Sequence, residues 1–194
     1  MRIAIVRYNA GNTASVVNAL GRLGAEALIT DDAATLAGAD KVIFPGVGEA
    51  SSAMAHLRER RLTEVIKSLQ QPVLGICLGM QLLCASSEEN DAGCLGVFPY
   101  RVRRFTGNGT KRLHTGWNTV NNLRSPLFNR IAEDEHFYFV HGYFAESGND
   151  TTANCTYGEV FSAAIGQANF HAVQFHPEKS GIAGEKILEN FLKL

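Results

Sequence analysis

The fold is decided by the stretch Val73-Leu74-Gly75-Ile76-Cys77-Leu78-Gly79-Met80-Gln81, in which a buried strand passes straight into a helix. Residues 73–76 form a continuous apolar run, the pattern of a strand buried on both faces of a parallel sheet. Residues 78–85 have helical character, and no loop separates them from the strand. A strand that turns directly into a helix is typical of α/β folds, which place their sites at the ends of sheet strands.

The same alternation of strand and helix occurs upstream. Residues 3–6 and 42–44 are short apolar runs, and each is followed by a helical stretch, residues 13–23 and 49–57. The first of these helices is amphipathic and is followed by Gly24, a typical carboxyl-terminal cap. Strands that alternate with helices predict a parallel sheet covered by helices.

Downstream of residue 96 the pattern changes to antiparallel strands. Residues 97–105, the turn-forming Gly107-Asn108-Gly109 and residues 111–113 predict a hairpin. Further strands are predicted at residues 137–140, 155–157, 160–165 and 172–175, and a closing amphipathic helix at residues 183–194. We therefore expect one domain over residues 1–194, a three-layer α/β sandwich around a mainly parallel central sheet with an antiparallel extension.

Length, charge and composition restrict the possible functions. The chain has 194 residues, which favours a single domain, and 45% of them are hydrophobic, enough for one core. Eighteen basic and nineteen acidic side chains give a formal charge of −1, so no overall attraction to nucleic acid or to an anionic membrane is expected. The apolar run at residues 3–6 is too short for a signal peptide or a membrane span.

The four cysteines, Cys77, Cys84, Cys94 and Cys155, show neither C-x-x-C spacing nor the density of a disulfide framework. We therefore expect no metal site, no cofactor, and a reducing, cytoplasmic location. Cys84, Cys94 and Cys155 are interpreted as structural residues.

The surroundings of Cys77 indicate a nucleophile. Gly75-Ile76-Cys77-Leu78-Gly79 has the form G-x-nucleophile-x-G, in which a sharp turn holds the central side chain in a strained conformation. Glycines fit both flanking positions because a Cβ there would crowd the turn. The sulfur would lie at a helix amino terminus, which favours the thiolate, and the Leu78 N–H could donate to an oxyanion. Alternatively, Cys77 is only a small buried apolar residue.

A thiolate nucleophile needs a base, and the chain has six histidines. His176 differs from the others because it belongs to Phe175-His176-Pro177-Glu178 at a predicted strand end, where residues two apart point to the same side. Glu178 would then orient the imidazole as the third member of a catalytic triad, and Pro177 would stiffen the segment. Alternatively, the segment is a surface turn. His171 is interpreted as structural.

Two further segments point to the same end of the sheet. Gln81 lies four residues after Cys77 and hence on the same helical face, where it could bind a polar substrate or be an ordinary surface glutamine. Gly46-Val47-Gly48 follows a strand and could bring backbone N–H groups close to a substrate. A nucleotide-phosphate loop is disfavoured there, because the third glycine of G-x-G-x-x-G is missing and Glu49 lies in the loop.

Together these segments resemble the class I (triad) glutamine amidotransferases. The resemblance rests on the nonapeptide that begins at Gly75 and on Val173-Gln174-Phe175-His176-Pro177-Glu178-Lys179-Ser180-Gly181. Pro45-Gly46-Val47-Gly48, His114-x-Gly116-Trp117-Asn118 and Tyr138-Phe139-Val140-His141 are similar to segments of the glutaminase subunits of imidazole glycerol phosphate synthase. The segments occur in the expected order over nearly the whole chain.

This resemblance implies a glutaminase reaction. Cys77 would attack the side-chain amide of L-glutamine, His176 would protonate the departing ammonia, and water would hydrolyse the γ-glutamyl thioester. It also implies an oxyanion hole formed by the backbone N–H groups of Val47 and Leu78, with the Val47 peptide reorienting before its N–H faces the hole. The positions near the bound glutamine are matched by Gly48, Gln81, Gly142 and Tyr143.

A partner is implied as well, a (β/α)8-barrel cyclase subunit that forms a heterodimer with the glutaminase. It would use the ammonia to make imidazole glycerol phosphate and aminoimidazole carboxamide ribonucleotide in histidine biosynthesis. Ammonia released into water at neutral pH is mostly protonated and loses its nucleophilicity, so internal transfer is expected. Because a glutaminase fold fills all 194 residues, the cyclase would be another chain.

The chain departs from the family pattern at three places. Where the family usually has Asp-Tyr-Gly, this chain has Arg7-Tyr8-Asn9. In the His-Met-Gly-Trp-Asn segment of the family, Thr115 replaces the methionine. Gly142 replaces a residue that is usually Ser or Thr. None of these departures alters the triad. They concern partner contacts and the binding of the glutamine α-substituents.

The residues leave three other functions open. One is a glutaminase of anthranilate, purine or pyridoxal phosphate synthesis, although the Gly-Gly-Glu-Ser segment of the last is absent and His114-x-Gly116-Trp117-Asn118 favours the histidine pathway. Another is a hydrolase of the α/β-hydrolase type, in which the catalytic residues follow one another along the chain as nucleophile, acid and base. Glu133, Asp134 and Glu159 lie between Cys77 and His176, where that order places the acid. A non-catalytic regulatory protein is disfavoured by the intact triad pattern.

Overall fold

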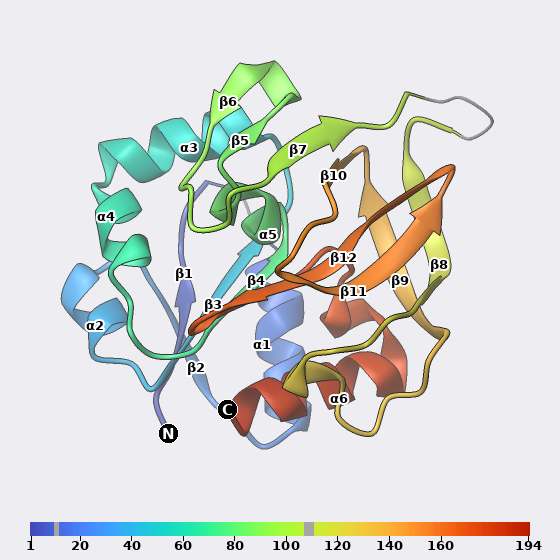
Figure 1. Cartoon of the computed structure of the whole chain (residues 1–194). Coiled ribbons are helices and arrows are strands. Elements are labelled where there is room, and N and C mark those ends of the chain that lie inside the picture. Colours follow the sequence, from blue (N-terminus) through green and yellow to red (C-terminus); the bar gives the residue numbers. More distant parts are fainter. Residues whose placement is uncertain (10–11, 107–110) are drawn as a thin grey trace.

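A large sheet forms the centre of the molecule (Figure 1). In the computed structural model, which describes residues 1–9, 12–106 and 111–194, it has seven strands in the order β11-β12-β13-β4-β3-β1-β2. The parallel strands are β1 (Ile3–Val6), β2 (Ala27–Thr30), β3 (Lys41–Gly46), β4 (Val73–Cys77) and β13 (Phe170–Val173). β11 (Thr151–Tyr157) and β12 (Glu159–Gln167) extend one edge in the antiparallel direction. The predicted mainly parallel sheet with an antiparallel extension is confirmed.

Helices cover both faces of this sheet (Figure 1). One face carries α1 (Thr13–Arg22) and α6 (Gly181–Leu192), and the other carries α2 (Ala33–Ala37), α3 (Ala50–Glu59), α4 (Leu62–Lys67) and α5 (Leu78–Leu83). Strand β1 shows how the layers form: Ile3 and Ile5 pack into the core beneath α1 and α6, whereas Ala4 and Val6 pack into the opposite core. Successive residues of a strand point to opposite faces, so an unbroken apolar run serves both cores.

The antiparallel part differs from the predicted hairpin. β7 (Arg101–Arg104) pairs with β10 (Tyr143–Ala145) and with β5 (Ser86–Ser87), which also pairs with β6 (Ala92–Gly93). β8 (His114–Val120) pairs instead with β9 (Glu135–His141) in a separate sheet. The predicted hairpin arms are therefore not partners, and the predicted turn at residues 107–109 lies outside the described residues. Turn-forming residues indicate a change of direction, but packing decides which strands then pair.

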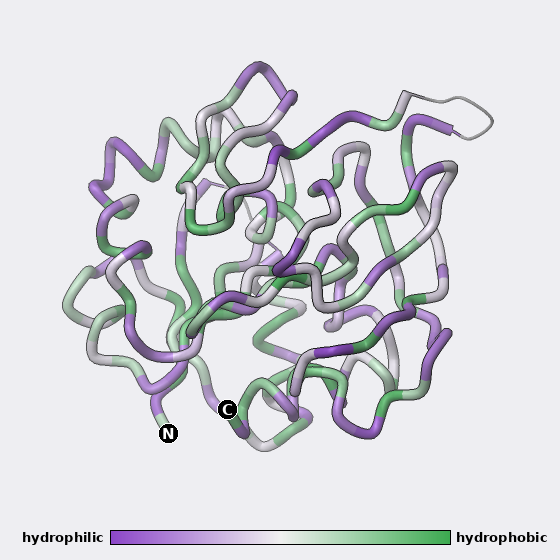
Figure 2. The backbone as a smooth tube through the Cα atoms, viewed as in Figure 1, coloured by the Kyte–Doolittle hydropathy of each residue, from purple (hydrophilic) through white to green (hydrophobic). Residues whose placement is uncertain are grey.

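Three short 3-10 helices, Glu89–Asp91, Pro126–Phe128 and η3 (Pro177–Lys179), complete the regular structure of the described residues. Figure 2 shows hydrophobic segments along the central strands and hydrophilic ones in the outer loops. Within residues 1–9, 12–106 and 111–194, no helix is both long and apolar enough to cross a bilayer.

Candidate active site

Cys77 lies at a turn without a loop, because β4 ends at Cys77 and α5 begins at the next residue. Its backbone has φ 53° and ψ −109°, a strained conformation for a residue with a side chain. A Cβ at Gly79 would lie 1.8 Å from the Phe44 carbonyl oxygen, and one at Gly75 would lie 2.8 Å from Leu83 Cδ1. The two glycines are thus required by close packing, as the sequence predicts.

Cys77 opens onto a cavity of about 390 Å³. The cavity lining includes every residue that the family resemblance places in the oxyanion hole or beside glutamine: Val47, Gly48, Leu78, Gln81, Gly142 and Tyr143. It also includes four residues that sequence reasoning missed, Glu89, Leu113, Val140 and His141. Val140 and His141 belong to the Tyr138–His141 segment that carries the family resemblance, although no role was assigned to them there. No local pattern marked Glu89 and Leu113, which folding brings to the cavity from other parts of the chain.

Strand register brings the Gly46-Val47-Gly48 segment to the cysteine. Gly46 lies opposite Cys77 in the parallel pairing of β3 with β4, so Val47 and Gly48 follow at the cavity. The Tyr8 hydroxyl packs behind this segment and donates a hydrogen bond to the Pro45 carbonyl oxygen at 2.8 Å. A Cβ at Gly46 would lie 2.1 Å from that hydroxyl oxygen. Burial, followed by the nearby charge of Cys77, raises the pKa of Tyr8 well above its usual value, so Tyr8 stays a neutral donor.

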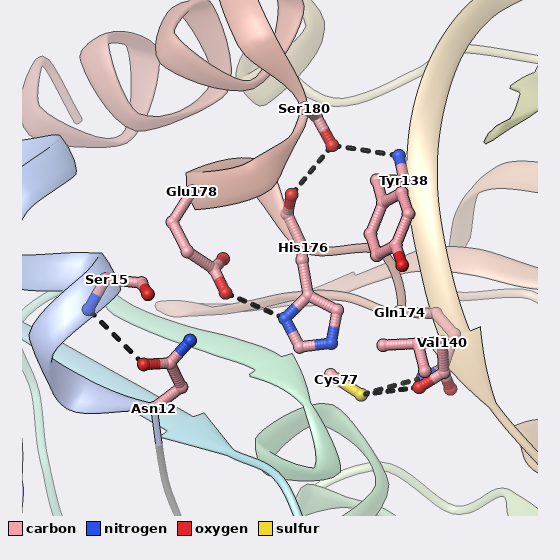
Figure 3. A network of polar contacts seen from close by, with 9 residues as sticks. All are labelled: Asn12, Ser15, Cys77, Tyr138, Val140, Gln174, His176, Glu178 and Ser180. Carbon is pink, nitrogen blue, oxygen red and sulfur yellow. Dashed lines mark hydrogen bonds and ion pairs between the residues drawn. The ribbon is translucent and has the colours of Figure 1, made fainter. Parts of the chain in front are cut away.

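His176 and Glu178 form a buried pair (Figure 3). His176 Nδ1 lies 2.8 Å from Glu178 Oε1, and both side chains are 2% exposed. The contact agrees with the sequence prediction, but the predicted extended backbone is wrong: β13 ends at Val173, and Glu178 lies within the 3-10 helix η3. The tight turn that begins at Pro177, rather than a strand, brings the carboxylate back to the ring.

The backbone of His176 is held from two sides. Its N–H donates to the Tyr138 carbonyl oxygen at 2.9 Å, and its carbonyl oxygen accepts from the Ser180 hydroxyl at 2.7 Å. The same hydroxyl accepts from the Tyr138 N–H at 3.0 Å, which links the histidine to β9 (Figure 3). The ring therefore has a fixed position in front of the Cys77 sulfur.

The charge of His176 depends on its two neighbours. Burial alone lowers the pKa of His176, but the hydrogen bonds and negative charges of the Cys77 sulfur and the Glu178 carboxylate outweigh it and raise that pKa to about 10. His176 Nε2 is buried, has no hydrogen-bond partner among the described residues, and faces the Cys77 sulfur (Figure 3). A protonated imidazole beside a sulfur stabilises the thiolate form.

Two of the three acids considered for an α/β-hydrolase order, Glu133 and Glu159, are engaged elsewhere. Glu133 accepts hydrogen bonds from the backbone N–H groups of Asn122 and Leu123. Glu159 forms an ion pair with Arg103 at 3.4 Å. The carboxylate at the His176 ring is that of Glu178, which disfavours this order.

Comparison with known proteins identifies the family. The model of the family "Glutamine amidotransferase class-I" matches residues 5–194. The chain is 54% identical to the imidazole glycerol phosphate synthase subunit HisH of Bacteroides fragilis strain YCH46 and 52% identical to that of Bacteroides thetaiotaomicron, each over 100% of both chains. It is 44% identical to the HisH subunit of Idiomarina loihiensis over 100% of this chain and 98% of the relative.

Solved structures show the same fold. A putative GMP synthase protein from Thermoplasma acidophilum matches with a TM-score of 0.78 and 19% identity, over 100% of this chain and 92% of that one. The structure of PurLQS from Thermotoga maritima matches with a TM-score of 0.73 and 18% identity, over 99% and 97%. At such identities the likeness concerns the fold alone. From the sequence relatives and the family match, the chain is an enzyme of the class-I glutamine amidotransferase family and belongs to the HisH group within it.

Proposed function

We propose that this chain hydrolyses L-glutamine to glutamate and ammonia with Cys77 as the nucleophile, His176 as general acid and base, and Glu178 as the carboxylate that orients His176. One observation carries the proposal: a strained cysteine that lines a cavity faces an imidazole whose other nitrogen is hydrogen-bonded to a buried carboxylate. This is the arrangement by which a thiol is activated for attack on a carbonyl carbon.

The choice of base rests on the ring nitrogens. His141 also lines the cavity, but both of its nitrogens are engaged, Nδ1 with the Tyr143 carbonyl oxygen at 2.7 Å and Nε2 with His114 at 3.0 Å. Burial lowers the pKa of His141 to about 3, so it stays neutral. Of these two imidazoles, His176 is the one that can exchange a proton at the sulfur.

The reaction proceeds in two steps. The Cys77 thiolate forms a bond to the side-chain carbonyl carbon of glutamine, and the backbone N–H groups of Leu78 and Val47 donate to the resulting oxyanion. His176 gives its proton to the amide nitrogen, the C–N bond breaks, and ammonia leaves a thioester behind. His176 then takes a proton from water, which attacks the thioester, and the thiolate departs as glutamate forms.

The cavity offers contacts for the rest of the substrate. Glu89 supplies a carboxylate to the lining, and one of its oxygens accepts from the Ala50 N–H at 2.7 Å. Burial raises the pKa of Glu89, a shift that a bound ammonium group would reverse, so we assign the glutamine α-ammonium to Glu89. Gly48, Gln81, Gly142 and Tyr143 border the remaining space. Because Gly142 replaces a hydroxyl residue of the family pattern, it contributes backbone groups only.

We also propose that residues 1–194 act as one glutamine amidotransferase domain that delivers ammonia to a (β/α)8-barrel cyclase in a heterodimer of histidine biosynthesis. The HisH relatives are named as subunits of imidazole glycerol phosphate synthase, which supports a partner. Exposed apolar side chains also support a partner: Val47 and Leu113 line the cavity and are 38% and 53% exposed. A partner docked there would contact the Val47 peptide and could reorient its N–H. The cysteine spacing, which favours no disulfide framework, supports a cytoplasmic location.

The test is an assay of ammonia release from glutamine by this chain, alone and with a candidate cyclase. We expect weak activity alone and activation by the cyclase with its ligand. Cys77→Ala should abolish glutamine-dependent synthesis and leave ammonium-dependent synthesis by the complex intact, whereas the matched control Cys94→Ala should affect neither. Glutaminase turnover by Cys77→Ala would contradict the nucleophile assignment, and full activity of the lone chain would contradict gating by a partner.

A further inference from the structure

Two buried side chains converge on the backbone carbonyl oxygen of Tyr143. His141 Nδ1 lies 2.7 Å from it, and Gln81 Nε2 lies 2.8 Å from it. A carbonyl oxygen can only accept hydrogen bonds, so both groups must donate. This single atom therefore determines the tautomer of His141 and the orientation of the Gln81 amide.

The first consequence concerns the histidines. Neutral His141 carries its proton on Nδ1, so its Nε2 accepts, and the atom 3.0 Å away is His114 Nδ1, which must donate. His114 Nε2 then accepts from the Asn118 side-chain amide at 3.1 Å. Burial lowers the pKa of His114 to about 4, so this ring is neutral as well. Each group in this series therefore donates to the next, from Asn118 through His114 and His141 to the Tyr143 carbonyl oxygen.

The second consequence concerns the glutamines. Gln81 Nε2 also lies 3.0 Å from Gln174 Oε1, so both hydrogens of the Gln81 amide are used inside the protein. Gln81 Oε1 is then the polar atom that this side chain can offer to a ligand in the cavity. Because Gln174 accepts with its oxygen, its Nε2 is the end that donates to the Cys77 sulfur at 3.6 Å (Figure 3).

Packing prevents these groups from exchanging roles. The His114 ring is stacked between Phe139 and Tyr157, with centroids 4.7 and 4.2 Å away and planes inclined by 23° and 20°. His114, His141 and Gln174 are all buried. A flip of one ring or amide would place two donors or two acceptors together in a buried site, where unsatisfied polar groups are costly.

We propose that His141 and His114 are positioning residues of the glutaminase and act through the Tyr143 carbonyl. They fix the Gln81 amide so that its oxygen accepts from an N–H group of glutamine. Through Gln81 they also fix Gln174 as a donor to the Cys77 sulfur. The inference rests on the proposed function, because it concerns the same cavity. Without the His141 donor, the Tyr143 peptide and the Gln81 amide can rotate, and the Gln81 NH₂ group can turn toward the substrate, where it would face another donor. A Gln174 that rotated in turn would present its oxygen to the thiolate.

The test compares two variants of His141 in the complex with the cyclase. In His141→Asn, the short amide can still donate to the Tyr143 carbonyl near the place of the lost Nδ1, whereas His141→Leu removes the donor. We expect His141→Leu to raise KM for glutamine about 10-fold, the size of one lost hydrogen bond. His141→Asn should keep KM within about 3-fold of the wild-type value, which corresponds to the lower end of the free-energy range of one hydrogen bond. Ammonium-dependent synthesis should be unchanged in both.

A second measurement needs no variant. Ring ¹⁵N shifts of the wild-type chain at neutral pH should show His114 and His141 both protonated on Nδ1. A proton on Nε2 of either ring, an unchanged KM in His141→Leu, or an Asn variant as impaired as the Leu variant would overturn the inference. Failure of the proposed function differs from these results, because it appears as a wild-type complex that releases no ammonia from glutamine.

Discussion

Two buried histidines of the site differ in charge: His141 lines the cavity, and His176 lies beside Cys77. His176 is held between a carboxylate and a thiol, and its pKa is raised to about 10. His141 is held between a carbonyl oxygen and a second imidazole, and burial lowers its pKa to about 3. Burial penalises the charged form of both rings, so the difference comes from their partners. Ionisable partners prepare a histidine for proton transfer, whereas neutral partners make it a rigid element of the hydrogen-bonded structure.

The largest expected effect comes from removing the charged histidine. His176→Asn leaves the sulfur without an imidazolium and the leaving nitrogen without a proton donor, so kcat for glutamine should fall about 10³-fold. The measurement is glutamine-dependent synthesis by the complex. The matched control is His136→Asn, at an exposed histidine of β9, which should behave as the wild type. Equal rates for the two variants would remove the distinction between His176 and the other histidines.

The next largest effect concerns the partner of His176. Glu178→Gln keeps the shape of the side chain but removes its charge, so the His176 pKa should fall from about 10 and kcat should drop about 10²-fold with little change in KM. Because the imidazolium would then lose its proton at lower pH, the alkaline limb of the pH–rate profile should move to lower pH. Glu189→Gln, at an exposed acid of α6, is the control. An effect on KM alone would contradict the orienting role of Glu178.

The neutral histidines predict how stability depends on pH. The pKa values of His114 and His141 are lowered to about 4 and about 3, and burial also lowers the pKa of His171. An unfolded histidine titrates near pH 6.5, so below that pH the unfolded state binds protons that the folded state does not. Stability should therefore fall as the pH drops from about 6.5 toward 4, by up to about 1.4 kcal/mol per pH unit for each of these rings.

Urea unfolding at several pH values between about 7 and 5 measures this slope. His141→Asn removes one titrating ring, so the unfolding free energy should change less steeply with pH. The difference in slope should correspond to at most one proton. Carboxylates such as Glu49, whose pKa is lowered to about 2 by hydrogen bonds from Ser51, Ser52 and Asn90, contribute only at lower pH. An identical slope in the wild type and the variant would show that His141 is not held neutral.

The smallest effect is expected at the far end of the histidine chain. Asn118→Ala removes the donor to His114 Nε2 but leaves the His141 contact with Tyr143 intact. KM for glutamine should rise about 3-fold with kcat unchanged, because one neutral hydrogen bond distant from the substrate is lost. Asn149→Ala, at an exposed position, serves as the control. An effect as large as that of His141→Leu would mean that the chain acts through Asn118 rather than through the Tyr143 carbonyl.

Local sequence patterns predicted much of the active site. The glycines around Cys77 and the spacing of His176 and Glu178 predicted the strand-to-helix turn and the contact of the imidazole with the carboxylate, because each of these features involves neighbours in the chain. The contact of His176 with Glu178 was predicted for the wrong reason, since a 3-10 turn forms it and not a strand. The hairpin prediction failed because a turn motif does not specify the partner of a strand.

The amino-acid sequence by itself determined the alternation of buried strands and helices, the family, and the residues that stand at the sheet ends. Only the tertiary structure decided that Tyr8 packs behind Gly46, that Glu89 enters the cavity, and that His141 is neutral while His176 is charged. The physical reason is that hydrophobic periodicity and turn geometry act between neighbours in the chain, whereas charge and hydrogen bonding in a buried site depend on groups that folding brings together.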